Sequence, residues 1–278
     1  MSDLNIVVFS YNFPHKKTQD FLIRLHISRI TPSLVIAAPP VQLNLPPSII
    51  RDKYKHIDLI HPKEICEIYN IEYVELDHSS PDVIHLIKER KINVGVIAGA
   101  RILKKPVIDA IEKGILNFHP GLIPENRGLH AAKWAVFRDL PQGMTVHLID
   151  ERVDAGKIVR RFIVPVYSDD TLRDINLRLY EVQVRELVDS LLILKSSNCK
   201  YIEVSEDVGY HPPADEVVDR YVEEKFNLYL GKWAYDLNEW KCVCGEVLQN
   251  KGEGKFFCTR CKRSYREKDG ILVEEFVK

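Results

Sequence analysis

Two patterns of hydrophobic and polar positions alternate along the first half of the chain. A short run of apolar, β-rich residues at 5–10 is typical of a strand buried on both faces, 115–118 predicts another short buried strand, and further strands are expected at 33–38, 72–76 and 92–98. Between them, apolar residues with helical spacing predict helices at 18–27, 61–70, 81–91 and 106–113. Strands that alternate with helices in this way predict an α/β fold with a mostly parallel sheet, right-handed crossovers and helices on both faces.

The second half of the chain predicts fewer and longer elements. We expect a helix at 129–140, strands at 144–150 and 158–166, a long amphipathic helix at 170–194 and another helix at 215–230. The segment Ser196-Ser197-Asn198 is typical of a linker. The predicted organisation is a catalytic domain at 1–195, a linker and helix at 196–238, and a small module at 239–278.

Composition narrows the class of protein. The chain has 278 residues, 45% of them hydrophobic, which allows one large α/β domain and a small appendage. Its net charge of −1 provides no global basic field for nucleic acid. The start, Met1 to Leu4, has no basic segment, and no apolar run approaches about 18 residues. We therefore expect a cytoplasmic protein with no signal peptide and no membrane span.

Four of the six cysteines are crowded near the end of the chain, as Cys242, Cys244, Cys258 and Cys261. Without an expected export signal, two close pairs indicate a metal site rather than disulfides. Four thiolates fit a structural, tetrahedral Zn²⁺ site in a zinc-ribbon-like module, although the first pair has one intervening residue instead of the usual two. The alternative is four free thiols. Such a ribbon could bind nucleic acid, bind a protein partner, or fix the end of the chain.

The polar residues best suited to chemistry lie between 115 and 156. Asn117 and His119 are two positions apart at the carboxyl end of the predicted strand 115–118, so in extended chain their side chains point to the same side. Ligands bind at this end of the strands in open α/β sheets. Asp154 lies in a turn after the next predicted strand and can reach back over the strand end. The three groups suit acyl transfer to an amine through a tetrahedral intermediate; the alternative is that they cap or stabilise loops.

The segment between 115 and 156 resembles the corresponding part of the folate-dependent formyltransferase family. The family pattern has a serine after His-Pro, where this chain has Gly121, and the resemblance covers about residues 1–195. The matching positions are Asn117, His119, Pro120, Pro124, Arg127, Gly128, Gly143, Thr145, His147, Asp154 and Gly156.

The resemblance implies a Rossmann-like formyltransferase sheet, an enzyme of one-carbon metabolism, and 10-formyltetrahydrofolate as the formyl donor. It implies catalytic roles for Asn117, His119 and Asp154, with Thr145 and His147 supporting the catalytic group. It also implies that Arg101, Ile102 and Leu103, together with Asp154, contact the folate.

The acceptor amine is left open. The family acts on glycinamide ribonucleotide, methionyl-tRNA and sugar nucleotides, and includes a formyltetrahydrofolate hydrolase. The turn Ser10 to Pro14 has no glycine, whereas glycinamide ribonucleotide enzymes carry a Gly-Ser-rich loop there for the substrate phosphate. The basic residues that follow, His15 to Lys17, meet an anion or form a solvated turn.

We therefore expect a small-molecule amine acceptor, with an amino-sugar nucleotide favoured. The alternatives are aminoacyl-tRNA or a protein amine delivered through the ribbon, glycinamide ribonucleotide, and folate hydrolysis. A different class of function also stays open, in which the chain is a partner-binding scaffold that carries a zinc ribbon.

Overall fold

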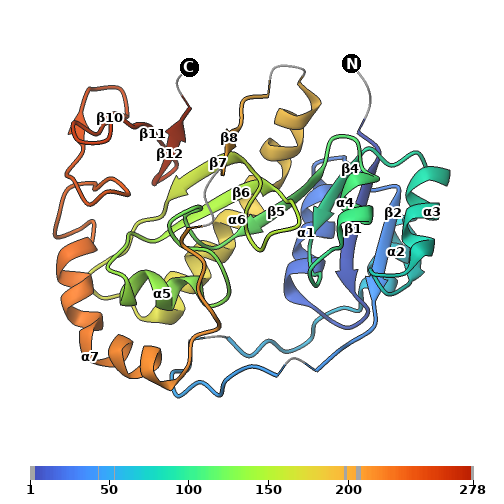
Figure 1. Ribbon diagram of the computed structural model, residues 1–278, viewed down its shortest axis with the longest axis horizontal. Coiled ribbons are helices and arrows are strands. Elements are labelled where there is room, and N and C mark those ends of the chain that lie inside the picture. Colours follow the sequence, from blue (N-terminus) through green and yellow to red (C-terminus); the bar gives the residue numbers. More distant parts are fainter. Residues whose placement is uncertain (1–3, 43, 53, 197–198, 205–207, 277–278) are drawn as a thin grey trace.

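The computed structural model describes residues 4–42, 44–52, 54–196, 199–204 and 208–276. The predicted linker residues Ser197 and Asn198, and the start of the chain before residue 4, lie outside these ranges. The described residues form a mixed α/β fold around one long sheet, with a small strand-rich module at the C-terminal end (Figure 1).

Five parallel strands form the first part of the sheet, in the order β3-β2-β1-β4-β5. Their order confirms the predicted α/β class, because each parallel connection requires a crossover through a helix or a long loop. The strands are β1 (Ile6–Tyr11), β2 (Leu34–Ala38), β3 (Glu72–Glu75), β4 (Val94–Ile97) and β5 (Ile115–His119).

Helices cover both faces of this parallel sheet, as the apolar runs of the strands predict. Along β1, Val8 packs on the face that carries Phe21 of α1, whereas Phe9 packs on the face that carries Val83 of α3. One face carries α1 (Lys16–Ile27), α2 (Pro62–Tyr69) and α6 (Leu172–Lys195); the other carries α3 (Pro81–Glu89) and α4 (Lys105–Asp109).

No helix in the described part of the chain is both long enough and apolar enough to cross a membrane.

The sheet turns antiparallel after β5. The next strands are β6 (Gly143–Leu148) and β7 (Lys157–Ile163), and the short β8 (Ile202–Glu203) pairs with the start of β7. The helix α5 (Ala131–Phe137) lies between β5 and β6 in the chain and is shorter than the predicted 129–140.

The C-terminal module continues the same sheet. Its strand β12 pairs antiparallel with the end of β7, where Leu272 lies opposite Ile163 and Val273 lies opposite Phe162. Beyond β12 (Ile271–Glu275) the sheet runs through β11 (Ser264–Lys268), β10 (Lys255–Phe257) and β9 (Gln249–Asn250).

The division of the chain into domains at 195 and 238 stays a prediction.

The described residues between 39 and 60 form a long strap that crosses the molecule between β2 and α2 and passes α7 (Glu216–Trp233), as the lower edge of Figure 1 shows. Asp219 of α7 is buried and accepts hydrogen bonds from Ser48 Oγ at 2.7 Å and Ile49 N at 2.9 Å. Lys133 of α5 donates to the other oxygen of Asp219 at 2.6 Å. The Pro-rich strap is therefore anchored to two helices at its centre.

Candidate active site

The three predicted catalytic side chains lie together at the carboxyl end of β5. Asn117 Nδ2 donates to Asp154 Oδ1 at 3.2 Å, and His119 Nδ1 lies 3.3 Å from Asp154 Oδ2. His119 is buried, whereas 16% of the Asp154 side chain is exposed. Because Asn117 and His119 share one side of the strand, a single carboxylate contacts both of them.

Arg127 holds the turn that presents Asp154. Its Nε donates to the carbonyls of Val153 at 3.0 Å and Asp154 at 2.9 Å, and its Nη2 donates again to Val153 at 2.7 Å. Gly128 N donates to Asp154 Oδ2 at 3.0 Å. Asp154 has a φ of 44°, in the left-handed region that aspartate tolerates better than most residues. The buried guanidinium therefore fixes a turn whose backbone is otherwise unfavourable.

His147 orients Asn117 from the neighbouring strand β6. Its Nδ1 lies 2.6 Å from the carbonyl of Ala155, an acceptor, so Nδ1 carries the proton. Its Nε2 then accepts from Asn117 Nδ2 at 3.1 Å. Burial lowers the pKa of His147 to about 4, against the opposing charge of Asp154. The ring is therefore neutral near pH 7, and its tautomer is set by Ala155.

Electrostatics keep Asp154 ionised. Burial by itself raises the pKa of this carboxyl, but the attraction of His119, the hydrogen bond from Gly128 and the charge of Arg127 outweigh burial, so that the pKa lies below its usual value. His119 Nε2 is 2.8 Å from the carbonyl of Asn126, so both ring nitrogens face acceptors. Both contacts are hydrogen bonds only when both ring nitrogens donate.

Both amide hydrogens of Asn117 are already used, one by Asp154 and one by His147. The two nitrogens of His119 are engaged as well. An oxygen of a substrate must therefore replace one of these acceptors before either residue can donate to it. The arrangement can supply hydrogen-bond donors, a proton and a base within one small volume.

The crowding around Gly121 explains why this chain has a glycine where the family pattern has a serine. A Cβ atom at this position would lie 2.5 Å from His119 Nε2 and 2.5 Å from the carbonyl of Asn126. Glycine therefore lets the ring of His119 lie against the loop that follows β5. Thr145 holds the same loop, because its hydroxyl donates to Gly121 O at 2.7 Å and accepts from Ile123 N at 3.0 Å.

His211 also supports this loop, although its sequence context indicates only a turn. Its Nε2 lies 2.8 Å from Asn126 Oδ1, while Asn126 Nδ2 donates to Ala131 O at 2.8 Å. Burial lowers the pKa of His211 to about 4. No local pattern signals this role, because the two partners are 85 positions apart in the chain.

The predicted folate-binding residues follow β4, and they differ in what they offer a ligand. Ile102 is 72% exposed, whereas Leu103 is 3% exposed and packs in the core with Phe9. Arg101 Nη2 lies 3.5 Å from the carbonyl of Pro39. Ile102 therefore offers an apolar surface, and Leu103 has only its main chain available for a ligand.

Lys17 lies beside the candidate site, which the sequence did not indicate. Its Nζ donates to the carbonyl of Phe118, which lies between Asn117 and His119, at 3.2 Å. Burial lowers the pKa of Lys17 to about 8, against the attraction of Asp154. Lys17 is partly buried and belongs to α1 rather than to the turn that precedes it.

The four C-terminal cysteines also come together. Their sulfur atoms all lie within 4.8 Å of one another, and all four are free of disulfides. Tetrahedral zinc with Zn–S bonds of about 2.3 Å places sulfurs about 3.8 Å apart. The geometry and the all-thiolate donor set therefore fit the predicted metal.

Comparisons with known proteins agree with this geometry. The family model described as "Formyl transferase" matches residues 50–191, just over half of the chain. A trifunctional purine biosynthetic protein adenosine-3 of Chironomus tentans is 37% identical over 94 residues, covering 32% of this chain and 7% of that protein. A phosphoribosylglycinamide formyltransferase of Escherichia coli (strain K12) is 32% identical over 116 residues, covering 41% of this chain and 50% of that protein.

A solved structure extends the likeness of fold over the whole chain. The sugar N-formyltransferase of a Shewanella species has a TM-score of 0.55 and 17% sequence identity, covering 99% of both chains. The chain spans half or less of the two curated relatives described above. The family match over residues 50–191 contains the whole Asn117–His119–Asp154 group, and the chain therefore belongs to the formyl transferase family.

Proposed function

We propose that the protein transfers the formyl group of 10-formyltetrahydrofolate to the primary amine of a small molecule. The observation that carries this proposal is the meeting of Asn117, His119 and Asp154 at the carboxyl end of β5. A hydrogen-bond donor, a protonated imidazole and a carboxylate are the groups that amine formylation requires. Membership of the formyl transferase family supports the same reaction.

The proposed reaction forms one bond and breaks one. The neutral amine attacks the formyl carbon, and the carbon–nitrogen bond to the folate breaks. Asn117 and His119 donate to the oxygen of the tetrahedral intermediate, and one well-placed donor of this kind is worth about 3 kcal/mol. The attacking amine loses one proton and the departing folate nitrogen gains one. Asp154 accepts the first, and His119 or a water held by Asp154 returns the second.

For the acceptor, we favour an amine whose phosphate does not bind at the loop after β1. Tyr11 and His15 pack against Gly99, where an added Cβ would lie 2.8 Å from the Tyr11 ring and 3.0 Å from His15. Burial lowers the pKa of His15 to about 4, so the ring is uncharged near pH 7. Lys16 pairs with Asp20 at 2.7 Å. These contacts fill the place of a phosphate loop, which supports an amino-sugar nucleotide over glycinamide ribonucleotide.

The test is a formylation assay with a mixed pool of acceptors. The full-length chain is incubated with 10-formyltetrahydrofolate, amino-sugar nucleotides, glycinamide ribonucleotide and aminoacyl-tRNA, and formylated products are identified by mass spectrometry. We expect product from an amino-sugar nucleotide. Product from another member of the pool would overturn the acceptor but keep the reaction, and failure to bind folate would overturn both.

A matched pair of variants ties the activity to the candidate site. Asp154→Asn removes the carboxylate that contacts Asn117 and His119 and should abolish most of the turnover. Asp150→Asn is the control, since Asp150 lies at the start of the same turn but pairs with Arg152 at the surface. Equal loss in the two variants would contradict the assignment of the site.

A further inference from the structure

The cysteine module, residues 239–276, provides its sulfur atoms with hydrogen-bond donors. The hydroxyl of Tyr265 lies 3.1 Å from Cys242 Sγ, and the backbone N of Cys261 donates to Cys258 Sγ at 3.4 Å. Such donors are typical of the surroundings of thiolates that bind a metal, because they offset negative charge on sulfur. The sulfurs of Cys242 and Cys261 are 3.3 Å apart, which a bound ion widens only slightly.

The core of this module includes a residue of the candidate active site. Leu122 lies in the loop that follows His119, residues 120–128, which we name the catalytic loop. It is 1% exposed and belongs to a separate apolar cluster that is otherwise formed by the module and by Ile163 of β7. The module members of the cluster are Trp240, Cys242, Val243, Leu248, Cys258, Tyr265 and Leu272.

An ionic network forms a second link between the module and the catalytic loop. Arg263, two residues after Cys261, reaches Glu125 of the loop, with its Nη2 3.2 Å from Glu125 Oε1. Arg161 of β7 lies 3.3 Å from Glu125 Oε2 and donates to the carbonyl of Ile123 at 2.8 Å. Arg161 is 3% exposed, whereas Glu125 and Arg263 are partly exposed.

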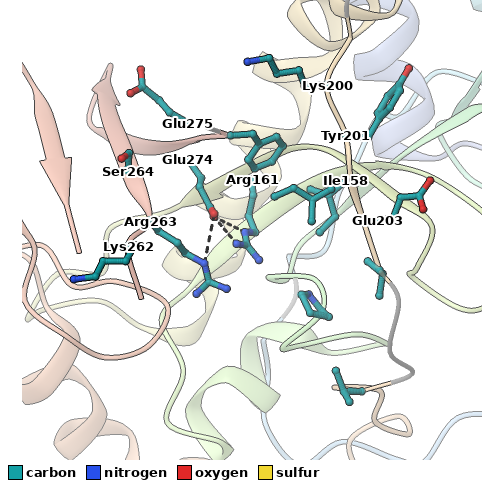
Figure 2. A pocket seen from close by; sticks show the side chains of 15 residues that line it. Ile158, Arg161, Lys200, Tyr201, Glu203, Lys262, Arg263, Ser264, Glu274 and Glu275 are labelled. Carbon is teal, nitrogen blue, oxygen red and sulfur yellow. Dashed lines mark hydrogen bonds and ion pairs between the residues drawn. The ribbon is translucent and has the colours of Figure 1, made fainter. Parts of the chain in front are cut away.

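Glu274 of β12 joins both arginines. Arg161 Nε donates to Glu274 Oε2 at 2.6 Å, and Arg263 Nε lies 3.5 Å from Glu274 Oε1. Figure 2 shows the three side chains side by side on the wall of a cavity of about 720 Å³ between β7 and the module. The carboxylate therefore connects the module strand to the two arginines that hold the loop.

From these contacts we infer that the four cysteines bind one zinc ion, and that the metal-bound module positions His119 by holding the catalytic loop. The metal fixes the segment of Arg263 and the apolar cluster around Leu122. Arg263 and the apolar cluster then hold the catalytic loop on both sides of Ile123. The carbonyl of Asn126 in this loop lies 2.8 Å from His119 Nε2. Loss of the metal then frees the ring of His119 without altering any residue of the candidate site.

Three cations of the module, Arg263, Arg266 and Lys268, contact acidic groups of the same chain. Arg266 pairs with Glu275 at 2.8 Å and Lys268 with Asp189 at 3.0 Å, while Arg263 contacts the catalytic loop. These cations neutralise acidic groups of the same chain, so they contribute little net positive field to an outside phosphate.

The first test measures metal and loop motion, so it does not depend on the proposed formyl transfer. Metal content of the full-length chain is determined by mass spectrometry, and backbone amide exchange is compared before and after removal of the metal. We expect one zinc per chain, and at least tenfold faster exchange at Asn126 N, which donates to Leu122 O at 2.7 Å, after its removal. Exchange within β1 should stay unchanged. Absence of bound metal, or unchanged exchange at Asn126, would overturn the inference.

The second test breaks the link on the loop side, away from the metal. Glu125→Gln removes the charge that Arg263 contacts, and Glu275→Gln removes the comparable exposed partner of Arg266 in the same module. Both variants should retain zinc. Only Glu125→Gln should speed amide exchange in the catalytic loop, by about tenfold. Identical exchange in the two variants would overturn the ionic part of the inference.

The catalytic consequence rests on the proposed function and is measured separately. Glu125→Gln should lower kcat about tenfold with little change in KM, because the substrates still bind while His119 is less well placed. If no acceptor is ever formylated, the exchange and metal measurements still decide the inference. If formylation is normal in Glu125→Gln while exchange is faster, the loop does not position His119 and the inference fails.

Discussion

Replacing His147 by glutamine should change how the stability of the protein depends on pH. The His147 side chain is fully buried, and its pKa falls from the usual 6.5 to about 4. Between these values the unfolded chain binds a proton that the folded chain does not, so the free energy of unfolding falls as the pH falls. The stabilising contribution of the neutral ring is complete above pH 6.5 and is lost between pH 6.5 and pH 4.

The magnitude follows from the two pKa values. Lowering the pH from 7.5 to 5 should reduce the free energy of unfolding by about 2 kcal/mol. Most of this loss arises over the roughly 1.5 pH units between the unfolded pKa and pH 5. Protonation of Nε2 would also place an N–H against the amide hydrogens of Asn117, which lie 3.1 Å away in nitrogen-to-nitrogen distance. The loss of stability and the disruption of the candidate site therefore have the same cause.

The assay is urea unfolding of the wild type and His147→Gln at pH 7.5 and pH 5, monitored by circular dichroism. Other buried histidines titrate in both proteins, so the difference between the two pH dependences isolates position 147. We expect the variant to lose about 2 kcal/mol less than the wild type on acidification. An equal loss in both proteins would show that His147 is protonated in the fold at pH 5, and would refute the lowered pKa.

Three further substitutions test the site. Asp154→Asn should lower kcat about 100-fold or more with the fold intact, measured by steady-state kinetics; a loss below tenfold would contradict a role in proton transfer. Arg127→Met should cost about 3 kcal/mol of unfolding free energy, because the carbonyls of Val153 and Asp154 lose a charged donor; urea unfolding measures this, and a loss under 1 kcal/mol would contradict it. Gly121→Ser should lower kcat about tenfold by displacing the ring of His119, and unchanged kinetics would show that the ring adapts.

The buried strands and the grouping of the site were accessible from the sequence. Apolar runs identify the buried strands β1, β2, β4 and β5, and the fifth predicted parallel strand, β3, is present at the edge of the sheet with its ends exposed. The pleat places Asn117 and His119 on one side of β5 whatever surrounds them. The position of Asp154 near these two residues could be predicted for a similar reason, since Asp154 lies in a short turn next to the strand that pairs with β5.

Contacts between distant segments could not be predicted in this way. Nothing in the local pattern of 271–275 identifies β7 as its partner, because strand pairing depends on the whole fold. The support of Asn126 by His211 depends on a similar long-range approach. The exposure of Ile102 and the burial of Leu103 were also hidden, since two adjacent apolar residues in a loop have no period that distinguishes them.

The pairing of β12 with β7 has a consequence for how the chain can be truncated. A chain ending near residue 238 would leave the second half of β7 as an open edge, with unpaired backbone groups at Phe162 and Ile163. It would also expose Leu122, which is now covered by the module. An unpaired strand edge beside apolar side chains can pair with the same strand of another copy of the chain. A chain produced without its last 40 residues should therefore self-associate.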